Sequence, residues 1–309
     1  MKKPFILTTT ALAMMLMSCS QKQEEKIEYP VTAKVDTVDV YFGTEVPDPY
    51  RWLEDDNSEE TGAWVTAQNE VTFGYLDKIP YREQFRQRLT ELWNYPKQDA
   101  PSKKGDHYFF FKNDGIQNQD VLYILSSLDA EPEILLDPNT LSEDGTVALS
   151  QISVSNDGKY LAYALATAGS DWNEIRVMDI ASKTDLDDHL QWVKFSDISW
   201  EKDGFYYSRY PEPEGGSELT GKNQYHKVFY HALGSAQDND RLIYENNEYP
   251  QRLYGLSVTE DEQHLILYEH ESSTGNAFYY RAANDPDGMF RPIVTDFDNT
   301  IKLEQTEYT

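Results

Sequence analysis

Apolar residues follow a helical spacing in the first third of the chain and an alternating spacing afterwards. Two series have the helical spacing: Trp64, Ala67, Val71 and Tyr75, and then Tyr81, Phe85, Leu89 and Leu92. Asn57, with Glu60 three residues later, has the pattern of a capping box before the first series, and Pro96 ends the second. Residues 27–47 are predicted to be extended. The pattern therefore predicts an extended segment and two helices before residue 100.

From residue 104 onward the apolar positions alternate, and a hairpin unit recurs. Residues 108–111 and 121–124 predict a first pair of strands around a turn. Three further hairpins, each with Asp-Gly or Glu-Asp at its turn, are predicted at residues 153–163, 198–207 and 256–268. A second pair of strands follows each hairpin, so the repeating unit has four strands.

The spacing of the hairpin turns indicates a propeller. Asp157, Asp203 and the Glu260-Asp261 pair are 46 and then 57 or 58 residues apart, close to the roughly 40–50 residues of known propeller repeats. Four-stranded blades around a central axis fit this pattern. We therefore predict a mainly β fold with about four blades between Lys104 and Thr309. A β-sandwich is the alternative, which the repeated hairpins disfavour.

Composition narrows the classes of partner. The 309 residues are enough for two domains or one large one, and the 13% aromatic content favours β structure. The formal net charge is −27. Because such a surface repels phosphate backbones and anionic lipid, we expect no nucleic-acid partner.

The N-terminus has the features of a bacterial lipoprotein precursor. Lys2 and Lys3 precede an apolar run of 13 residues, 5–17, which is too short for a spanning helix of roughly 20 residues. Residues 16–19, Leu-Met-Ser-Cys, resemble a lipobox, and Cys19 is the single cysteine, so no intrachain disulfide can form. We predict a signal peptide at 1–18, lipidation and membrane anchoring through Cys19, and a tether at 19–28. The protein would then be an exported lipoprotein, periplasmic or associated with the outer membrane.

The sequence contains no recognisable catalytic or metal-binding motif. A nucleophilic serine of the hydrolase type needs Gly-x-Ser-x-Gly, and the nearest segment, residues 215–219, lacks the last glycine. His226 and His231 flank a predicted strand, and their spacing of five suits neither helical nor strand metal ligation. For these and the other four histidines we expect hydrogen-bonding or surface roles. We assign no catalytic residue, metal or cofactor to this chain.

Residues 48–55, Asp-Pro-Tyr-Arg-Trp-Leu-Glu-Asp, resemble the opening block of the prolyl oligopeptidase family of serine peptidases. The resemblance runs from about residue 29 to near residue 280, with further blocks in the family's order at residues 91–97, 115–119, 135–139, 141–149, 169–172, 193–195 and 230–234.

The resemblance implies the N-terminal part of such an enzyme. In the family a seven-bladed β-propeller gates access to an α/β-hydrolase domain, which cleaves short proline-containing peptides after proline through an acyl-enzyme. This implies an incomplete propeller at 101–309, preceded by a strand and helical segment at 29–100 that packs on the hydrolase domain. The hydrolase half, with its Ser, Asp and His, is missing from this chain, which alone should be inactive.

Four residues match positions near the family's substrate pocket. Phe195, in Val-Lys-Phe at 193–195, matches a pocket phenylalanine, with a plain core aromatic as the alternative. Leu253 and Ser273 fall where well-known animal members place Met and Cys. Asp171 matches a carboxylate near the domain interface, with a turn acid that accepts backbone N–H groups as the alternative.

Two other functions stay open at this point. One is a non-catalytic propeller lipoprotein that binds a peptide or a partner protein. The other is a related oligopeptidase that cuts after basic residues. Residues 115–119, Gly-Ile-Gln-Asn-Gln, and 169–172, Gly-Ser-Asp-Trp, resemble the prolyl branch more closely.

Overall fold

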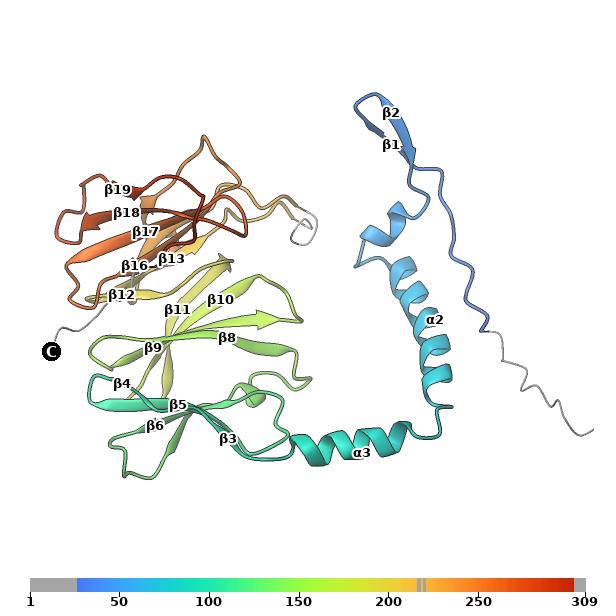
Figure 1. Ribbon diagram of the computed structural model, residues 1–309, viewed down its shortest axis with the longest axis horizontal. Helices are drawn as coiled ribbons and strands as arrows, with labels where there is room; N and C mark the ends of the chain where they lie inside the picture. Colours follow the sequence, from blue (N-terminus) through green and yellow to red (C-terminus); the bar gives the residue numbers. More distant parts are fainter. Residues whose placement is uncertain (1–26, 216–217, 219–220, 303–309) are drawn as a thin grey trace, which may run out of the picture. The chain divides into compact units, whose positions relative to one another are not determined.

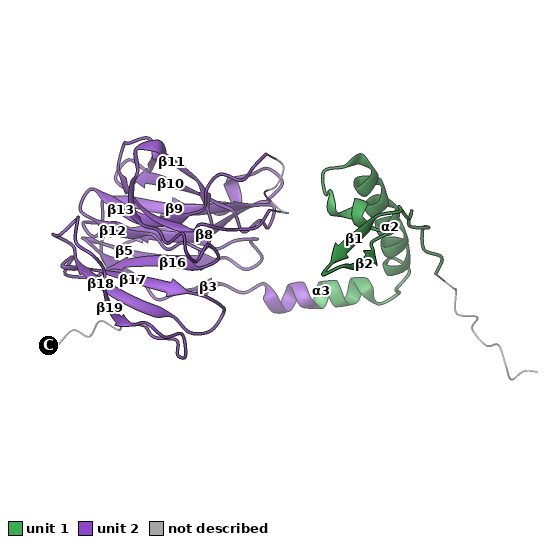
Figure 2. Ribbon diagram, turned by 90° about the horizontal axis from the view of Figure 1, so that it is seen from above, with its two compact units in different colours: residues 1–88 green, residues 89–309 purple. Residues whose placement is uncertain are grey.

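The computed structural model describes residues 27–215, 218 and 221–302 (Figure 1). The chain divides into two compact units, residues 1–88 and 89–309 (Figure 2). The predicted signal peptide and Cys19 lie outside the described residues.

The first unit contains a short hairpin and a long helix. Strands β1 (Val38–Tyr41) and β2 (Thr44–Pro47) are joined by Phe42 and Gly43, which both have positive φ, as a tight two-residue turn requires. Helix α2 (Glu59–Leu76) is capped by Ser58, whose hydroxyl accepts a hydrogen bond from the Thr61 amide. The predicted capping box at Asn57 and Glu60 is therefore wrong by one residue. Helix α3 (Arg82–Trp93) follows and crosses the boundary between the units.

The block at residues 48–55 is held together by Arg51, within the short helix η1 (Arg51–Glu54). The Arg51 guanidinium donates to Asp48 at 2.7 Å and also to Asp39, on β1. The Trp52 indole N–H donates to the Ala33 carbonyl at 3.0 Å. These contacts tie the extended segment and the hairpin to η1, so residues 48–55 stabilise the fold of the first unit.

The second unit consists, in its described part, of four groups of antiparallel strands in chain order (Figure 1), of which the second and third are joined in one sheet by the pair Val193↔Arg209. We call them blades 1 to 4. Blade 1 has β4 (Ser102–Lys104), β5 (His107–Asn113), β6 (Val121–Leu125) and β7 (Glu133–Leu136), with β3 (Lys97–Gln98) also on β5; blade 2 has β8 (Val147–Val154), β9 (Tyr160–Thr167), β10 (Asn173–Asp179) and β11 (Thr184–Val193). Blade 3 has β12 (Ser199–Glu201), β13 (Gly204–Arg209), β14 (Lys227–Ala232) and β15 (Arg241–Tyr244); blade 4 has β16 (Leu253–Val258), β17 (His264–His270), β18 (Ala277–Ala282) and β19 (Arg291–Val294). Two short helices, η2 (Pro138–Thr140) and η3 (Gln237–Asn239), lie in the connections.

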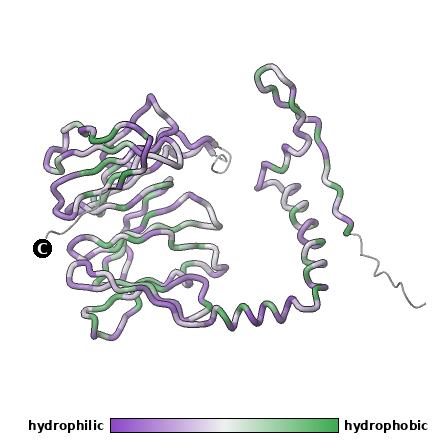
Figure 3. Tube along the Cα trace, viewed as in Figure 1, coloured by the Kyte–Doolittle hydropathy of each residue, from purple (hydrophilic) through white to green (hydrophobic). Residues whose placement is uncertain are grey.

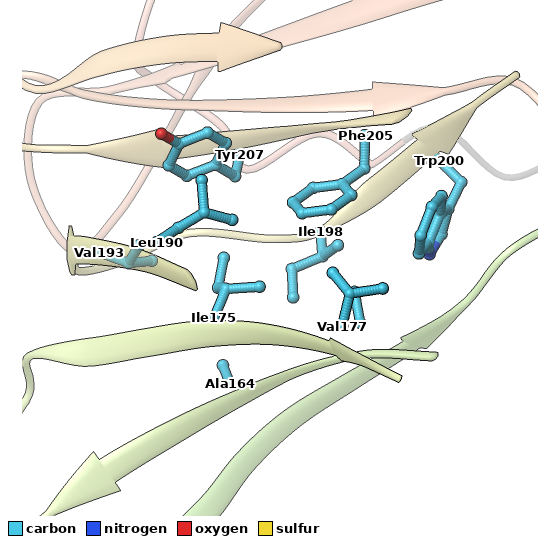
Figure 4. Close-up of a cluster of buried hydrophobic side chains, with 10 residues drawn as sticks. Ala164, Ile175, Val177, Leu190, Val193, Ile198, Trp200, Phe205 and Tyr207 are labelled. Carbon is cyan, nitrogen blue, oxygen red and sulfur yellow. The ribbon is translucent and has the colours of Figure 1, made fainter. Parts of the chain in front are cut away.

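Each junction between neighbouring blades holds its own apolar core. Apolar segments occur in all four blades (Figure 3), and central strands such as β6 and β9 are apolar on both faces, so each blade can pack against a neighbour on either side. Between blades 2 and 3, Ile175 and Leu190 meet Trp200, Phe205 and others in one buried cluster (Figure 4). Equivalent clusters join blades 1 and 2 and blades 3 and 4. The predicted mainly β propeller architecture, with about four blades, is confirmed.

The first strand of each blade is the strand nearest the central axis of the propeller. A cavity of about 570 Å³ is lined by residues of β4, β8, β12 and β16, the first strands of the four blades, together with flanking residues such as Asn156 and Thr259. The Asn156 side chain donates to Glu262 and accepts from the Lys104 ammonium, joining blades 1, 2 and 4 near the hairpin turns. This arrangement places the central axis between the four inner strands.

Two of the three hairpin turns differ from the sequence prediction. The first has Gly158 at φ +72, as expected. In the second, Glu201 pairs with Gly204, so Lys202 (φ +54) and Asp203 form the turn and Gly204 belongs to β13. In the third, Glu262 rather than Glu260 or Asp261 has the positive φ, +53.

Candidate functional site

The four predicted site residues lie at one edge of the blades. The strand registers Val147↔Thr167, Arg209↔Lys227 and Leu253↔His270 bring the end of each second strand beside the start of the first or third strand of its blade. The loops between second and third strands, residues 114–120, 168–172 and 271–276 and the described part of 210–226, therefore share this edge, together with the entries to β12 and β16. We call it the loop edge.

Phe195 is exposed at the loop edge. It lies two residues after the end of β11, has φ +54, and exposes 54% of its surface. A left-handed conformation is uncommon for a bulky residue and persists only where the surroundings hold it. Because more than half of its surface is exposed, the Phe195 ring is not part of a buried cluster and is available to contact a ligand.

Lys194 connects Phe195 to the neighbouring loop. Its side chain is only 10% exposed, and the ammonium lies 5.0 Å from the Trp172 ring centre and 5.4 Å from that of Phe195. The same ammonium is 3.5 Å from the exposed Asp171 carboxylate. The structure thus joins Asp171 and Phe195 through Lys194, in an ion pair rather than the alternative turn in which the Asp171 side chain caps backbone amides.

A cavity of about 450 Å³ opens beside this cluster. Trp172 and Tyr210 form one wall, with their rings edge to face at 6.0 Å. Glu212 and Tyr225 also line it. The Trp172 indole donates to the Glu218 carbonyl at 2.8 Å, which fixes the ring against the 210–226 loop. An aromatic wall with a few polar groups can receive an apolar side chain of an extended peptide.

Leu253 and Ser273 lie further along the loop edge, on blade 4. Leu253 is half-buried at the start of β16, and Ser273 is exposed in the loop after β17. The preceding residue, Arg252, stacks on the Tyr249 ring at 3.6 Å and binds the buried Glu269 carboxylate at 2.9 Å. These contacts fix the entry of β16.

His226 links the part of the loop edge that carries Phe195 to the part that carries Leu253. The sequence did not predict this role. The ring is 1% exposed, its Nε2 lies 2.9 Å from the Lys194 carbonyl, and its Nδ1 accepts the Tyr254 amide at 3.0 Å. Burial lowers the pKa of His226 to about 4, against the smaller opposing effect of the Lys194 hydrogen bond, so the ring is neutral at pH 7. Both partners are main-chain atoms distant in sequence, which no spacing rule detects.

His231 sits in a different environment, between two buried carboxylates. Nε2 lies 2.8 Å from Asp188 and Nδ1 lies 2.7 Å from Asp240, and all three side chains are almost fully buried. Burial alone would lower the pKa of His231, but the hydrogen bonds and charges of the two carboxylates raise it. Since both ring nitrogens are occupied, His231 has no free atom to act as a base for a nucleophile.

The loop edge presents groups that can contact a ligand. In residues 27–215, 218 and 221–302 no group of three His, Cys, Asp or Glu side chains is arranged to hold a metal ion. Nor does any helix in that part of the chain have the length and apolar character to cross a membrane. The edge offers aromatic faces, charged side chains such as Lys194, Asp171 and Arg252, and main-chain groups.

One protein-family model matches the whole of the second unit and most of the first. The family model described as prolyl oligopeptidase, N-terminal beta-propeller domain, matches residues 30–309. Prolyl endopeptidase of Elizabethkingia meningoseptica is 41% identical over 302 residues, covering 97% of this chain and 43% of that protein. Prolyl endopeptidase of Elizabethkingia miricola is 40% identical with the same coverage. The chain therefore spans less than half the length of these relatives.

A solved structure agrees with this relationship. Prolyl oligopeptidase B from Galerina marginata, bound to a 35mer hydrolysis and macrocyclization substrate, is 32% identical with a TM-score of 0.75. The match covers 87% of this chain and 41% of that one.

Proposed function

The chain belongs to the prolyl oligopeptidase family, and we propose that it is the peptide-facing propeller part of a serine peptidase that cleaves short peptides after proline. The observation that carries the proposal is the 41% identity, over 97% of the chain, to a protein named prolyl endopeptidase. In this proposal the chemistry belongs to a hydrolase domain encoded after residue 309. A serine there would form the acyl-enzyme, with an oxyanion hole that stabilises the tetrahedral intermediate.

The loop edge supplies contacts to the peptide on the amino-terminal side of the proline. Phe195 and the aromatic wall at Trp172 and Tyr210 would pack on an apolar side chain there. Leu253 and Ser273 would extend the same surface on blade 4. At the hairpin end of the axis, the Asn156 and Glu262 contact would narrow the channel that admits peptides.

Export and anchoring complete the proposal. The basic residues Lys2 and Lys3, the short apolar run and the lipobox-like residues before Cys19 support a lipid anchor on an exported protein. Because each buried methylene contributes about 0.8 kcal/mol, two or three acyl chains would hold the protein at a membrane surface. Radiolabelled palmitate should enter the wild-type protein and should not enter Cys19→Ser.

The test begins with the reading frame after the Thr309 codon. We expect it to encode Gly-x-Ser-x-Gly, Asp and His in that order, and the whole protein to hydrolyse a glycyl-proline p-nitroanilide. Phe195→Ala should lower kcat/KM for longer peptides about tenfold, as loss of one large apolar contact predicts. Leu128→Ala, another exposed apolar side chain but outside the loop edge, is the matched control.

Two results would replace this function by another. Cleavage after arginine, with none after proline, would identify an oligopeptidase with basic specificity. A stop codon with no hydrolase sequence would favour a non-catalytic binding protein.

A further inference from the structure

The two parts of the loop edge that carry Phe195 and Leu253 belong to different blades. Phe195 lies in the connection from blade 2 to blade 3, and Leu253 opens blade 4. Strand pairing does not link them, because β16 pairs only with β17. Some other contact must set their relative position.

His226 supplies that contact. The Tyr254 amide can only donate, so Nδ1 of His226 is the acceptor and the proton resides on Nε2, which donates to the Lys194 carbonyl. Lys194 precedes Phe195, and Tyr254 follows Leu253. One neutral ring therefore spans from the main chain beside Phe195 to the main chain beside Leu253.

The surrounding hydrogen bonds make this bridge part of a closed network. The Ser208 hydroxyl donates to the Tyr254 carbonyl at 2.7 Å, and the Ser208 amide donates to the Ser196 hydroxyl at 2.7 Å. Both neighbours of Phe195 are thus tied to blade 3, and both main-chain polar groups of Tyr254 are tied to it as well. The tilted Tyr210 ring, 4.6 Å from that of His226, holds the imidazole in place.

We propose that His226 is a positioning residue for peptide binding, which sets the separation of Phe195 and Leu253 through the Lys194 carbonyl and the Tyr254 amide. This inference rests on the proposed function, since it assumes that Phe195 contacts the peptide. His226 touches no peptide itself. It acts by limiting the conformations of the left-handed Phe195 segment, so that the binding surface exists before the peptide arrives.

The test compares His226→Asn with Tyr163→Phe in the full 309-residue chain. Asparagine places an acceptor where Nδ1 lies, so it keeps the Tyr254 bond and loses the Lys194 bond. Tyr163→Phe removes a bond to the Asp185 carboxylate from an equally buried position in blade 2 and leaves the network around Phe195 and Leu253 untouched. Amide hydrogen exchange, measured without peptide, should become faster at Phe195 and Ser196 in His226→Asn only. Unchanged exchange there would overturn the inference.

Peptide affinity provides the second measurement. The probe is a fluorescently labelled Phe-Gly-Pro-Ala peptide, followed by anisotropy at a temperature where every variant is folded. We expect His226→Asn to raise Kd about tenfold, as one lost buried hydrogen bond in this network predicts, and Tyr163→Phe to leave Kd within about threefold of the wild-type value. Equal losses in both variants, or none in His226→Asn, would overturn the positioning role.

Phe195→Ala separates this inference from the proposed function. If Phe195→Ala weakens binding and His226→Asn does not, the positioning role fails and the function stands. If the wild-type chain does not bind the peptide, or Phe195→Ala binds as tightly, the proposed function fails, whatever the exchange data show.

Discussion

Two histidines five residues apart have pKa values shifted in opposite directions, and the groups around each ring determine the direction. His226 faces a backbone amide and a carbonyl, and its pKa falls to about 4. His231 faces two carboxylates, and its pKa is raised. If a buried imidazolium between two carboxylates is removed, the carboxylates remain charged and lose the positive group that compensates them.

His231 therefore gives a pH-dependent prediction. A raised folded pKa means that the contribution to stability is fully present below the unfolded value, about 6.5, and is lost as the pH rises through the folded value. His231→Gln should lower the free energy of unfolding by about 3–5 kcal/mol at pH 6, and by clearly less at pH 9. Urea denaturation at both pH values measures the difference.

The matched control for that experiment is His264→Gln. His264 is exposed at the start of β17, so its substitution should change stability by less than about 0.5 kcal/mol at either pH. A His231→Gln effect of equal size at pH 6 and pH 9 would mean that the ring is neutral in the folded protein.

At the scale of single elements, two glycines in strands have contrasting surroundings. Gly204 begins β13, and a Cβ there would lie 2.2 Å from the His231 carbonyl oxygen on β14. Gly255, inside β16, has nothing within 4 Å of the same position. Gly204 is therefore required by the close approach of the neighbouring strand, whereas Gly255 is not.

Replacing each glycine by alanine should separate these two cases. Gly204→Ala should destabilise by about 1–3 kcal/mol, because β13 and β14 must move apart. Gly255→Ala should be neutral or stabilising by up to about 1 kcal/mol, because alanine restricts the unfolded chain. Thermal unfolding followed by circular dichroism measures both. Equal losses would show that strand flexibility, rather than the close approach, determines the effect.

The same elements show what the sequence can and cannot predict. The Asp157-Gly158 turn was predictable, because glycine at a positive φ is a local signal. The Lys202 and Glu262 turns were misplaced by one or two residues, because a non-glycine residue in that conformation is selected by the register of the strands around it. Ser58 and Asn57 are both good caps, and the choice between them depends on where the chain enters α2.

For the candidate site, the sequence located residues but not their connections. The family resemblance placed Phe195, Leu253, Ser273 and Asp171, which the structure brings to one edge. It left the exposure of Phe195 open, gave Lys194 no role, and predicted hydrogen bonding or surface exposure for His226 but not its bridge between two blades. The partners of His226 are 32 and 28 residues away and are backbone atoms, so only the folded chain shows them.

At the scale of the whole molecule, charge should limit stability. The formal net charge is −27, and such an excess of one sign opposes the compact state. Exposed ion pairs, such as Arg86 with Glu83, offset little of this, because each contributes about 0–1 kcal/mol. Salt weakens both effects, and the repulsion is the larger because it involves every acidic residue at once.

Added salt should therefore stabilise this protein. The Debye length shrinks from about 30 Å at 0.01 M to about 8 Å at 0.15 M, so most acid–acid repulsion across the surface is screened over that range. Tm at pH 7 should rise by several degrees between these concentrations of sodium chloride. Choline chloride should give the same rise, because screening depends on ionic strength rather than on the cation. A Tm that rises with sodium alone would mean that bound sodium ions neutralise the charges. A Tm that stays constant would mean that repulsion between the acidic residues does not limit stability.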